Sequence, residues 1–329
     1  MGRVTRGLVR ALSGDAAFEV TLLARGRDAR SLAAEFSSAR IAAPATARKR
    51  GTFDAVWYPF NGMRFDAVAP SVVTIHDAFA FSEPRAERIA RMREQQPILR
   101  AVRRAAKLVT VSEWSRSEIV RELGVPGATV TVIPTPPDPF FFPAAGDVLP
   151  MPLERERFVL VVGASEARKN VRLALEACAL ALSGTHETLV IAGDLPAPER
   201  VLARELGVRC GEIAPRDDVL RALYRNASVV LVPSRAEGFG LVAVEALACG
   251  AAVIAANAAA LPEATQGAAI LLPAADAALW ARTIRSLLDD PIRLAEQRAR
   301  GAAQFADCDR TAHHKRLRAI LREAAGDRS

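Results

Sequence analysis

Short runs of aliphatic and β-branched residues recur along the chain, and each run is followed by a segment with helical patterning. In the second half these runs are continuous and do not alternate with polar residues, as in FVLVVG (158–163) and SVVLVPS (228–234). Continuous runs of this length are typical of strands buried on both faces of a parallel sheet. Strands that alternate with helices form βαβ units, so the pattern predicts an α/β fold.

The runs fall into two sets, and a proline-rich segment separates them. The expected strands lie at 18–23, 54–58, 71–77, 107–111 and 129–133, and then at 158–163, 188–193, 228–234, 251–257 and 268–272. The segment IPTPPDPFFFPAAGDVLPMP (133–152) contains seven prolines, which fix φ and remove hydrogen-bond donors. We therefore predict two doubly wound, Rossmann-like domains. The predicted boundaries are 1–140, a linker at 141–153, and 154–329, with a last helix that returns to the first domain.

Composition and charge limit the kinds of partner. Half of the residues are hydrophobic and a quarter are charged, as in a globular protein. Residues 1–150 hold 21 Lys/Arg and 15 Asp/Glu, a net charge of +6, and residues 85–107 hold eight basic and two acidic residues. This segment is either a solvated helix face or a surface that meets anionic lipid headgroups. Aromatic residues are not interleaved with the basic ones, which argues against a nucleic-acid partner.

The segment SRAEGFGLVAVEALACG (234–250) contains the strongest candidate site residues. Glu245 is the only charged residue between Phe239 and Gly250. Moving an unbonded polar group into apolar surroundings costs about 2–7 kcal/mol. Either a structural partner or a ligand must therefore bind the carboxylate of Glu245.

Four readings of this segment remain open. Gly238-x-Gly240-x-x-Ala243 after a strand matches a dinucleotide fingerprint, although it comes late in the chain. The two glutamates, Glu237 and Glu245, could be the acid and base of a glycosidase, although their spacing disfavours it. They could instead hold two parts of one elongated ligand, such as a nucleotide-sugar, with the phosphates at the helix N-terminus. In the structural reading, an arginine pairs with Glu245 and the loop is ordinary.

The segment PSRAEGFGLVAVEALACGAAVIAANAAALPEA resembles the signature of family 4 retaining glycosyltransferases, which have the GT-B fold. VVGASEARKNVRLALEA (161–177), LVTVSEWSRSEIVRELGVP and VVTIHDAFA also resemble segments of this family. The HD and E-x-R-K-N forms are most similar to its mannosyltransferase-like branch. The resemblance covers nearly the whole chain and implies two Rossmann-like domains that face a cleft.

The resemblance assigns a donor-binding role to residues of the second domain. Glu237 would lie near the hydroxyl groups of the donor sugar and take part in catalysis, and Glu245 would hold the ribose diol. Arg168 and Lys169 would neutralise the diphosphate, because a leaving nucleoside diphosphate needs its charge stabilised by a metal ion or by cations. The alternative is that these two cations start a solvated helix. The remaining donor-binding candidates are Gly163, Gly238, Phe239, Gly240 and Leu241.

In the first domain His76 ends a strand, and the resemblance places it near the reacting centre, with Asp77 orienting it. Ser112 is either an N-cap or an acceptor-side residue, and the cap is the preferred reading. Gly2 is the third acceptor-side candidate. The other histidines, His186, His313 and His314, are expected at the surface. No metal site is predicted, because the D-x-D pattern of Asp307 and Asp309 lies in a tail segment without a phosphate loop.

Two departures from the family pattern stand out. Thr135-Pro136-Pro137 replaces the usual Asn-Gly after VIP, so this turn must differ. The family begins with a central strand and a Gly-rich loop before Gly2-Arg3, and RVTRGLVRAL already reads as a helix. We therefore expect the true start to lie upstream of Met1. The alternative is a first domain that lacks this strand.

These observations predict a metal-independent retaining glycosyltransferase without a cofactor. Its substrates would be a GDP- or UDP-linked hexose, with mannose favoured, and a glycan or lipid-linked acceptor. The alternative is a non-catalytic nucleotide-sugar-binding or assembly protein derived from such an enzyme. No run of 18 apolar residues lacks a charge, and the four cysteines include no C-x-x-C pair. We therefore expect a cytoplasmic protein that contacts the inner membrane peripherally through residues 85–107.

Overall fold

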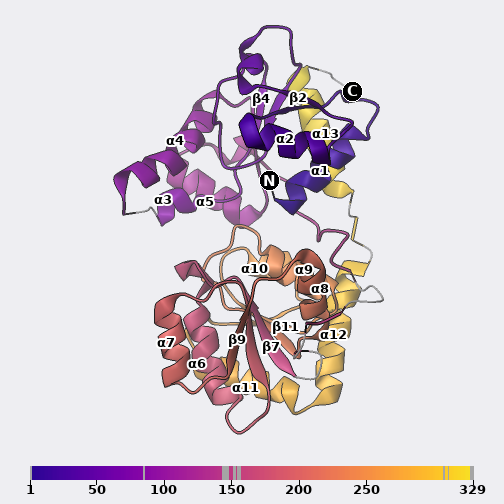
Figure 1. Cartoon of the computed structure of the whole chain (residues 1–329). Helices are drawn as coiled ribbons and strands as arrows, with labels where there is room; N and C mark the ends of the chain where they lie inside the picture. The colour runs from indigo at the N-terminus through magenta and orange to yellow at the C-terminus, as the bar shows by residue number, and fades with distance from the viewer. Residues whose placement is uncertain are drawn as a thin grey trace. The chain divides into compact units, whose positions relative to one another are not determined.

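The computed structural model describes residues 2–83, 86–142, 148–150, 153, 157–306, 308–309 and 311–326. The chain forms two compact units (Figure 1). The first consists of Met1–Thr135 together with Arg310–Ser329, and the second of Pro136–Asp309. The proline-rich linker predicted at 141–153 lies inside the second unit, and its residues 143–147 and 151–152 lie outside the described residues.

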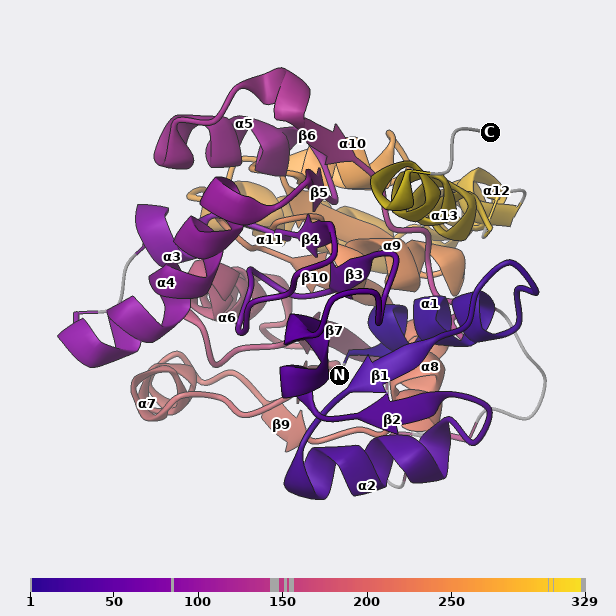
Figure 2. The same cartoon turned by 90° about the horizontal axis from the view of Figure 1, so that it is seen from above.

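The first unit contains two parallel sheets (Figure 2). Its strands are β1 (Thr21–Leu23), β2 (Arg40–Ala42), β3 (Val56–Tyr58), β4 (Ser71–Thr74), β5 (Lys107–Thr110) and β6 (Val130–Val132). Its α-helices are α1 (Arg3–Ser13), α2 (Gly26–Glu35), α3 (Phe79–Ser82), α4 (Arg88–Arg104), α5 (Glu113–Leu123) and α13 (Ala312–Ala325). β1 and β2 pair with each other, whereas β3, β4, β5 and β6 form a second sheet in that order.

The first and the last helix of the chain pack in the same core of the first unit. Leu8 and Leu12 of α1 lie one turn apart, so both face inward, where they meet Leu317 and Leu321 of α13. Val72 of β4 belongs to the same cluster. The predicted helix at RVTRGLVRAL is therefore α1, and its apolar face is what holds it on the unit.

The second unit is a single doubly wound sheet. Its strands are β7 (Phe158–Val162), β8 (Thr188–Ala192), β9 (Cys210–Ile213), β10 (Val229–Val232), β11 (Val253–Ala256) and β12 (Ile270–Leu272). Its α-helices are α6 (Val171–Ala181), α7 (Ala197–Glu205), α8 (Asp217–Asn226), α9 (Leu241–Ala248), α10 (Leu261–Thr265), α11 (Ala277–Leu288) and α12 (Pro291–Ala306). The sheet order is β12-β11-β10-β7-β8-β9, and all its pairs are parallel.

The strand order of this sheet reverses between β7 and β10, which pair through Val159↔Val229 and Val161↔Leu231. β8 and β9 lie on the β7 side of this point, and β11 and β12 lie on the β10 side. The α/β fold and the parallel sheets predicted from the apolar runs are confirmed. In open sheets of this kind the crevice beyond the carboxyl ends of the strands at the reversal is the ligand site. The loops after β7 and β10 are therefore expected to form the ligand site of this unit.

Each expected strand has a counterpart in the structure, but two strands were missed. β2 is only three residues long, Arg40–Ala42, and begins with an exposed arginine. β9 is an edge strand that carries the exposed Gly211 and Glu212. Neither strand is buried on both faces, so neither shows the continuous apolar run on which the prediction depended.

Candidate functional site

The loops after β7 and β10 bring two cations and one carboxylate together. Glu237 accepts from Lys169 Nζ through Oε1 at 2.8 Å and from Arg168 Nη1 through Oε2 at 3.0 Å. All three side chains are largely buried, with 10%, 14% and 16% of the side-chain surface of Glu237, Lys169 and Arg168 exposed. The reading of Arg168 and Lys169 as a solvated helix start is therefore wrong. These predicted donor-site residues lie in one cluster although 69 positions separate Arg168 from Glu237.

Arg168 holds a second carboxylate on the other edge of its guanidinium. Its Nε donates to Glu166 Oε2 at 2.9 Å and its Nη2 to Glu166 Oε1 at 3.1 Å, which is a bidentate fork. Its Nη1 also donates to the carbonyl of Ala236 at 3.1 Å. Glu166 was not predicted as a site residue, although its spacing of two from Arg168 was visible in the sequence.

The protonation states of the cluster follow from these contacts. Burial alone would raise the pKa of Glu237, but the charge and hydrogen bond of Lys169, the charge of Arg168 and the hydroxyl of Ser234 outweigh it, so the pKa lies below its ordinary value. Burial would lower the pKa of Arg168, but Glu237 and Glu166 together raise it above its ordinary value. Glu237 is therefore a carboxylate at neutral pH, and it balances two cations at close range.

Asn170, the residue after Lys169, links its own loop to two other loops of the second unit. Its Nδ2 donates to the carbonyls of Pro233 and Ala274, each at 3.0 Å, and only 5% of the residue is exposed. Its backbone adopts a left-handed conformation with φ of 54°, which asparagine tolerates better than most residues. Arg235 N donates to Arg168 O at 2.8 Å and adds a backbone link between the loops. No role was predicted for Asn170.

The glycine-rich loop and the start of α9 lie where the sequence predicts them. Gly240 has φ of 104°, and a Cβ there would lie 2.8 Å from Leu261 Cδ2, so this position needs glycine. Leu241 is the first residue of α9, Phe239 packs against the core, and Gly238 lies one residue after Glu237. Gly163, after β7, has φ of 76°, and a Cβ there would contact the stem of Lys169 at 3.6 Å.

Glu245 lies inside α9 with 3% of its surface exposed. The hydroxyl of Tyr224, on α8, donates to its Oε2 at 3.4 Å. Tyr224 is fully buried, and its ring meets Phe141 edge-on at 5.8 Å. A tyrosine hydroxyl is thus one partner of the carboxylate, where the structural reading named an arginine. Nothing in the sequence marked Tyr224, because α8 shows ordinary amphipathic spacing.

The first unit places its predicted residues at the carboxyl ends of β4 and β5. His76 Nε2 lies 2.9 Å from the carbonyl of Pro59, which can only accept, so this nitrogen carries the hydrogen. Ser112 is buried and its Oγ accepts from Ser115 N at 2.9 Å, so the predicted N-cap is confirmed. Ser115 Oγ in turn donates to His76 O at 2.8 Å, which links the two candidates.

Asp77 and Gly2, the other two acceptor-side candidates, both lie next to the start of a helix. Asp77 Oδ1 accepts from Phe79 N at 3.3 Å, a local contact in the turn that leads into α3. Gly2 precedes α1 as its exposed N-cap. The surface expectation is wrong for His313, which is only 9% exposed because it lies on the inner side of α13. Burial, then the charges of His76 and Arg316, lower the pKa of His313 to about 4.

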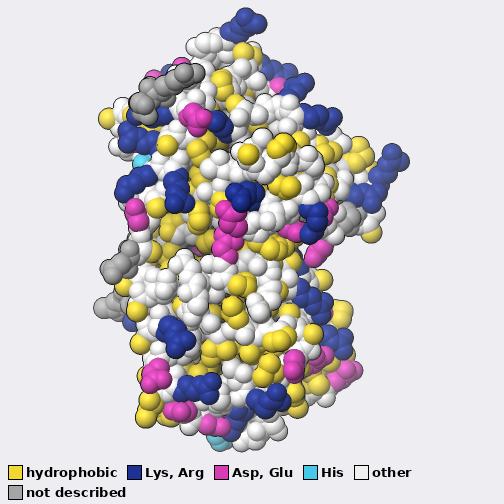
Figure 3. Space-filling model, turned by 180° about the vertical axis from the view of Figure 1, so that it is seen from behind, with side chains coloured by type: hydrophobic (Ala, Val, Ile, Leu, Met, Phe, Trp, Pro, Cys, Tyr) yellow, Lys and Arg dark blue, Asp and Glu magenta, His cyan; other side chains and the backbone are white. Residues whose placement is uncertain are grey.

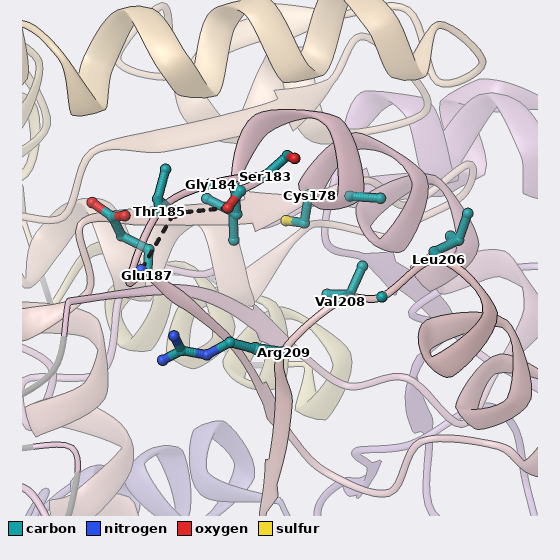
Figure 4. A pocket seen from close by; sticks show the side chains of 11 residues that line it. Cys178, Ser183, Gly184, Thr185, Glu187, Leu206, Val208 and Arg209 are labelled. Atoms are coloured by element: carbon teal, nitrogen blue, oxygen red, sulfur yellow. Dashed lines mark hydrogen bonds between the residues drawn. The ribbon is translucent and has the colours of Figure 1, made fainter.

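A separate cavity of about 210 Å³ lies at the amino ends of β8 and β9 (Figure 4). Cys178, Thr185, Glu187 and Arg209 are among its lining residues. Because the sheet is parallel, the amino ends of its strands lie at the edge opposite the loops that carry Glu237. Burial raises the pKa of the Cys178 thiol, so this sulfur is a poor nucleophile. The cavity is therefore not part of the candidate site.

Metal-binding clusters and membrane-spanning helices are both absent from the part of the chain that the structure describes. There, no group of three or more His, Cys, Asp or Glu residues is arranged to hold a metal ion. Asp307, one half of the D-x-D pattern, lies outside the described residues. Within the same residues, no helix combines the length and the apolar character needed to cross a membrane.

Known proteins resemble this chain in sequence and in fold. The model for Glycosyltransferase Family 4 matches residues 1–139, and that for Glycosyl transferases group 1 matches residues 151–304. The O-antigen chain mannosyltransferase B of Escherichia coli is 33% identical over 266 residues, which are 75% of this chain and 69% of that protein. A D-inositol 3-phosphate glycosyltransferase of Mycolicibacterium smegmatis is 35% identical over 215 residues, 61% of this chain and 47% of that protein.

Solved structures with the GT-B fold match nearly the whole chain. Anabaena Alr3699/HepE in complex with UDP-glucose has a TM-score of 0.75 at 18% identity, and the match covers 98% of this chain and 96% of that one. WaaG, a glycosyltransferase involved in lipopolysaccharide biosynthesis, has a TM-score of 0.74 at 16% identity, with the same coverage. With both family models, a relative matched over most of its length and the GT-B architecture in agreement, this chain belongs to the family 4 glycosyltransferases.

Proposed function

We propose that this protein is a retaining glycosyltransferase that moves a hexose from a nucleotide-sugar to a glycan or lipid-linked acceptor. The cluster of Arg168, Lys169 and Glu237 at the strand-order reversal is the observation that carries this proposal. A leaving nucleoside diphosphate develops negative charge, and two buried cations fixed in place stabilise that charge without a metal ion. A carboxylate beside them suits the hydroxyl groups of the sugar.

The remaining second-unit residues have supporting roles in this proposal. Gly238 and Gly240 let the backbone approach the sugar and the diphosphate, and the N-terminus of α9 favours negative charge. Glu245 holds the ribose diol, which requires the nucleotide to reach a carboxylate that is now 3% exposed. In the first unit His76, Asp77 and Ser112 stay predictions based on the family resemblance.

The donor is proposed as a GDP- or UDP-linked hexose. Mannose is favoured because the Escherichia coli relative is named a mannosyltransferase, and glucose is the competing choice because the HepE complex contains UDP-glucose. A thermal-shift screen with GDP-mannose, UDP-glucose, ADP-glucose and dTDP-glucose tests this choice, because a ligand that binds only the native state raises its melting temperature. The proposal fails if none of these donors raises the melting temperature.

Catalysis and stereochemistry are tested with the donor that binds. We expect Glu237→Ala to lose most of kcat and Glu245→Ala mainly to raise the donor KM. NMR of the product should show the anomeric configuration of the donor, as retention requires. Donor binding without turnover on any glycan or lipid-linked acceptor would favour the alternative, a non-catalytic nucleotide-sugar-binding protein.

Peripheral membrane contact is proposed through α4. Ile89 and Met92 are 59% and 47% exposed, and the exposed Arg93 and Arg103 lie on the same side of the helix. Basic and hydrophobic side chains lie side by side on the surface (Figure 3). Such a face binds anionic lipid through both apolar burial and charge. We expect the protein to co-sediment with phosphatidylglycerol vesicles but not with phosphatidylcholine vesicles. Replacing Arg93 and Arg103 by glutamine should reduce the co-sedimentation with phosphatidylglycerol.

A further inference from the structure

The carboxylate of Glu237 already pairs with Arg168 and Lys169, the two cations that the proposed donor diphosphate requires. Each of its oxygens serves one cation, Oε1 that of Lys169 and Oε2 that of Arg168. Glu166 takes the Nε and Nη2 edge of the same guanidinium. Two carboxylates therefore already balance two cations, and a diphosphate with two or more negative charges would leave the cluster with excess negative charge.

We infer that Glu237 and the diphosphate of a bound nucleotide are alternative anions for Arg168 and Lys169, so that Glu237 weakens the binding of the nucleoside diphosphate product. This inference rests on the proposed function. When the diphosphate binds, Glu237 leaves the cations. When the diphosphate departs, Glu237 returns to them and completes the exchange.

Glu237, and not Glu166, is the carboxylate that exchanges. Glu166 grips one guanidinium through two parallel bonds, a geometry that is stronger and more directional than single contacts. Glu237 makes one hydrogen bond to each cation, and it precedes Gly238 and Gly240 in a loop. Glu166 thus acts as a positioning residue. It keeps the guanidinium of Arg168 in place while Arg168 Nη1 exchanges Glu237 for the diphosphate.

The nature of the ligand decides how much the exchange costs. Glu237 is 8% exposed, so once it leaves the cations it needs other donors, because an unpaired buried charge is unfavourable. The hydroxyl groups of a nucleotide-sugar supply such donors, whereas a nucleoside diphosphate has no sugar to do so. The competition therefore acts more strongly on the product than on the donor, which favours product release after transfer.

The test measures binding of UDP and GDP by calorimetry at fixed ionic strength. For whichever of the two the wild type binds, Glu237→Gln should tighten binding roughly ten-fold, the equivalent of about 1.4 kcal/mol for one charged contact removed. Binding of the corresponding nucleotide-sugar should tighten less or weaken. Binding of uridine and guanosine, which lack phosphate, should not change.

Asp289→Asn is the matched control, because Asp289 also pairs with an arginine, at 3.1 Å from Arg285 Nη2 at the far end of α11, and its side chain is 59% exposed. It removes the same charge from the same unit and should leave all affinities unchanged. Glu237→Asp keeps the charge but shortens the side chain, so it should tighten binding less than glutamine does. This second variant provides the same comparison should Glu237→Gln fail to fold.

Three outcomes would overturn the inference. If the wild type binds UDP or GDP and Glu237→Gln binds it equally or more weakly, the competition is absent although the proposed function stands. Equal tightening by Asp289→Asn would mean that only net charge matters. If the wild type binds neither nucleoside diphosphate, the proposed function itself fails and the inference with it.

Discussion

Asn170 offers a sharp test of how the candidate site is built. Its Nδ2 donates to the carbonyls of Pro233 and Ala274, both at 3.0 Å. Asn170→Asp preserves the size of the side chain and its tolerance of the left-handed backbone, but replaces the donor with an oxygen. Two carbonyl oxygens would then face a carboxylate, so the substitution removes the donor and adds a negative charge at a buried position.

The size of the effect follows from these two contacts. Losing the two hydrogen bonds costs about 2 kcal/mol, and leaving their buried acceptors without this donor adds about 1 kcal/mol or more in total. The variant should therefore lose about 3 kcal/mol of unfolding free energy. For a unit of this length that corresponds to a fall in melting temperature of roughly 6–12 °C.

Urea denaturation of the full chain, followed by tryptophan fluorescence and circular dichroism, measures this loss. The loss of unfolding free energy in Asn170→Asp should become smaller when the pH is lowered from 7 to 5. The reason is that a protonated carboxyl group can donate one hydrogen bond, so the folded state favours the protonated form. Asn170→Gly is the control: it keeps the backbone conformation, loses both bonds and should show no such recovery. A loss below about 1 kcal/mol at neutral pH would show that these bonds do not hold the loops together.

Three further variants test separate contacts. Gly240→Ala places a Cβ 2.8 Å from Leu261 Cδ2 at φ of 104°, so stability should fall by about 1–3 kcal/mol, measured by thermal unfolding. Tyr224→Phe removes the hydroxyl 3.4 Å from Glu245, so the donor KM should rise several-fold while the loss of stability stays below about 1 kcal/mol. For His313, burial lowers the pKa from 6.5 to about 4, so below pH 6.5 the unfolded chain gains a proton that the folded one does not. Wild-type stability should fall as the pH drops from 6.5 to 4, and His313→Gln should reduce that fall by up to about 3 kcal/mol.

The sequence predicts most of the second unit because its strands are buried on both faces. Continuous apolar runs such as Val229–Val232 need no knowledge of their neighbours, whereas the exposed Glu212 in β9 hides an edge strand. No single apolar run predicts the order in which the strands pair. It is this order, with β10 beside β7, that brings Glu237 to Arg168.

The candidate site shows the same division between local and long-range information. The resemblance predicts that Arg168, Lys169 and Glu237 serve one donor, but it does not predict that they bind one another in the structure. Asn170 and Tyr224 act through contacts with residues far away in sequence, so their roles depend on the packed fold. His313 was misplaced because its helix is amphipathic, and the pattern alone left open which side of it would face inward.

The composition of the first unit has a consequence for how the protein is made. Its core includes Leu317, Ile320 and Leu321 of α13, which the ribosome adds only after the whole of the second unit. Pro136–Asp309 is continuous and can fold while synthesis proceeds, whereas Leu8 and Leu12 must wait for their partners. A chain truncated after Asp309 should thus resist proteolysis over residues 136–309 and be cleaved readily over residues 1–135.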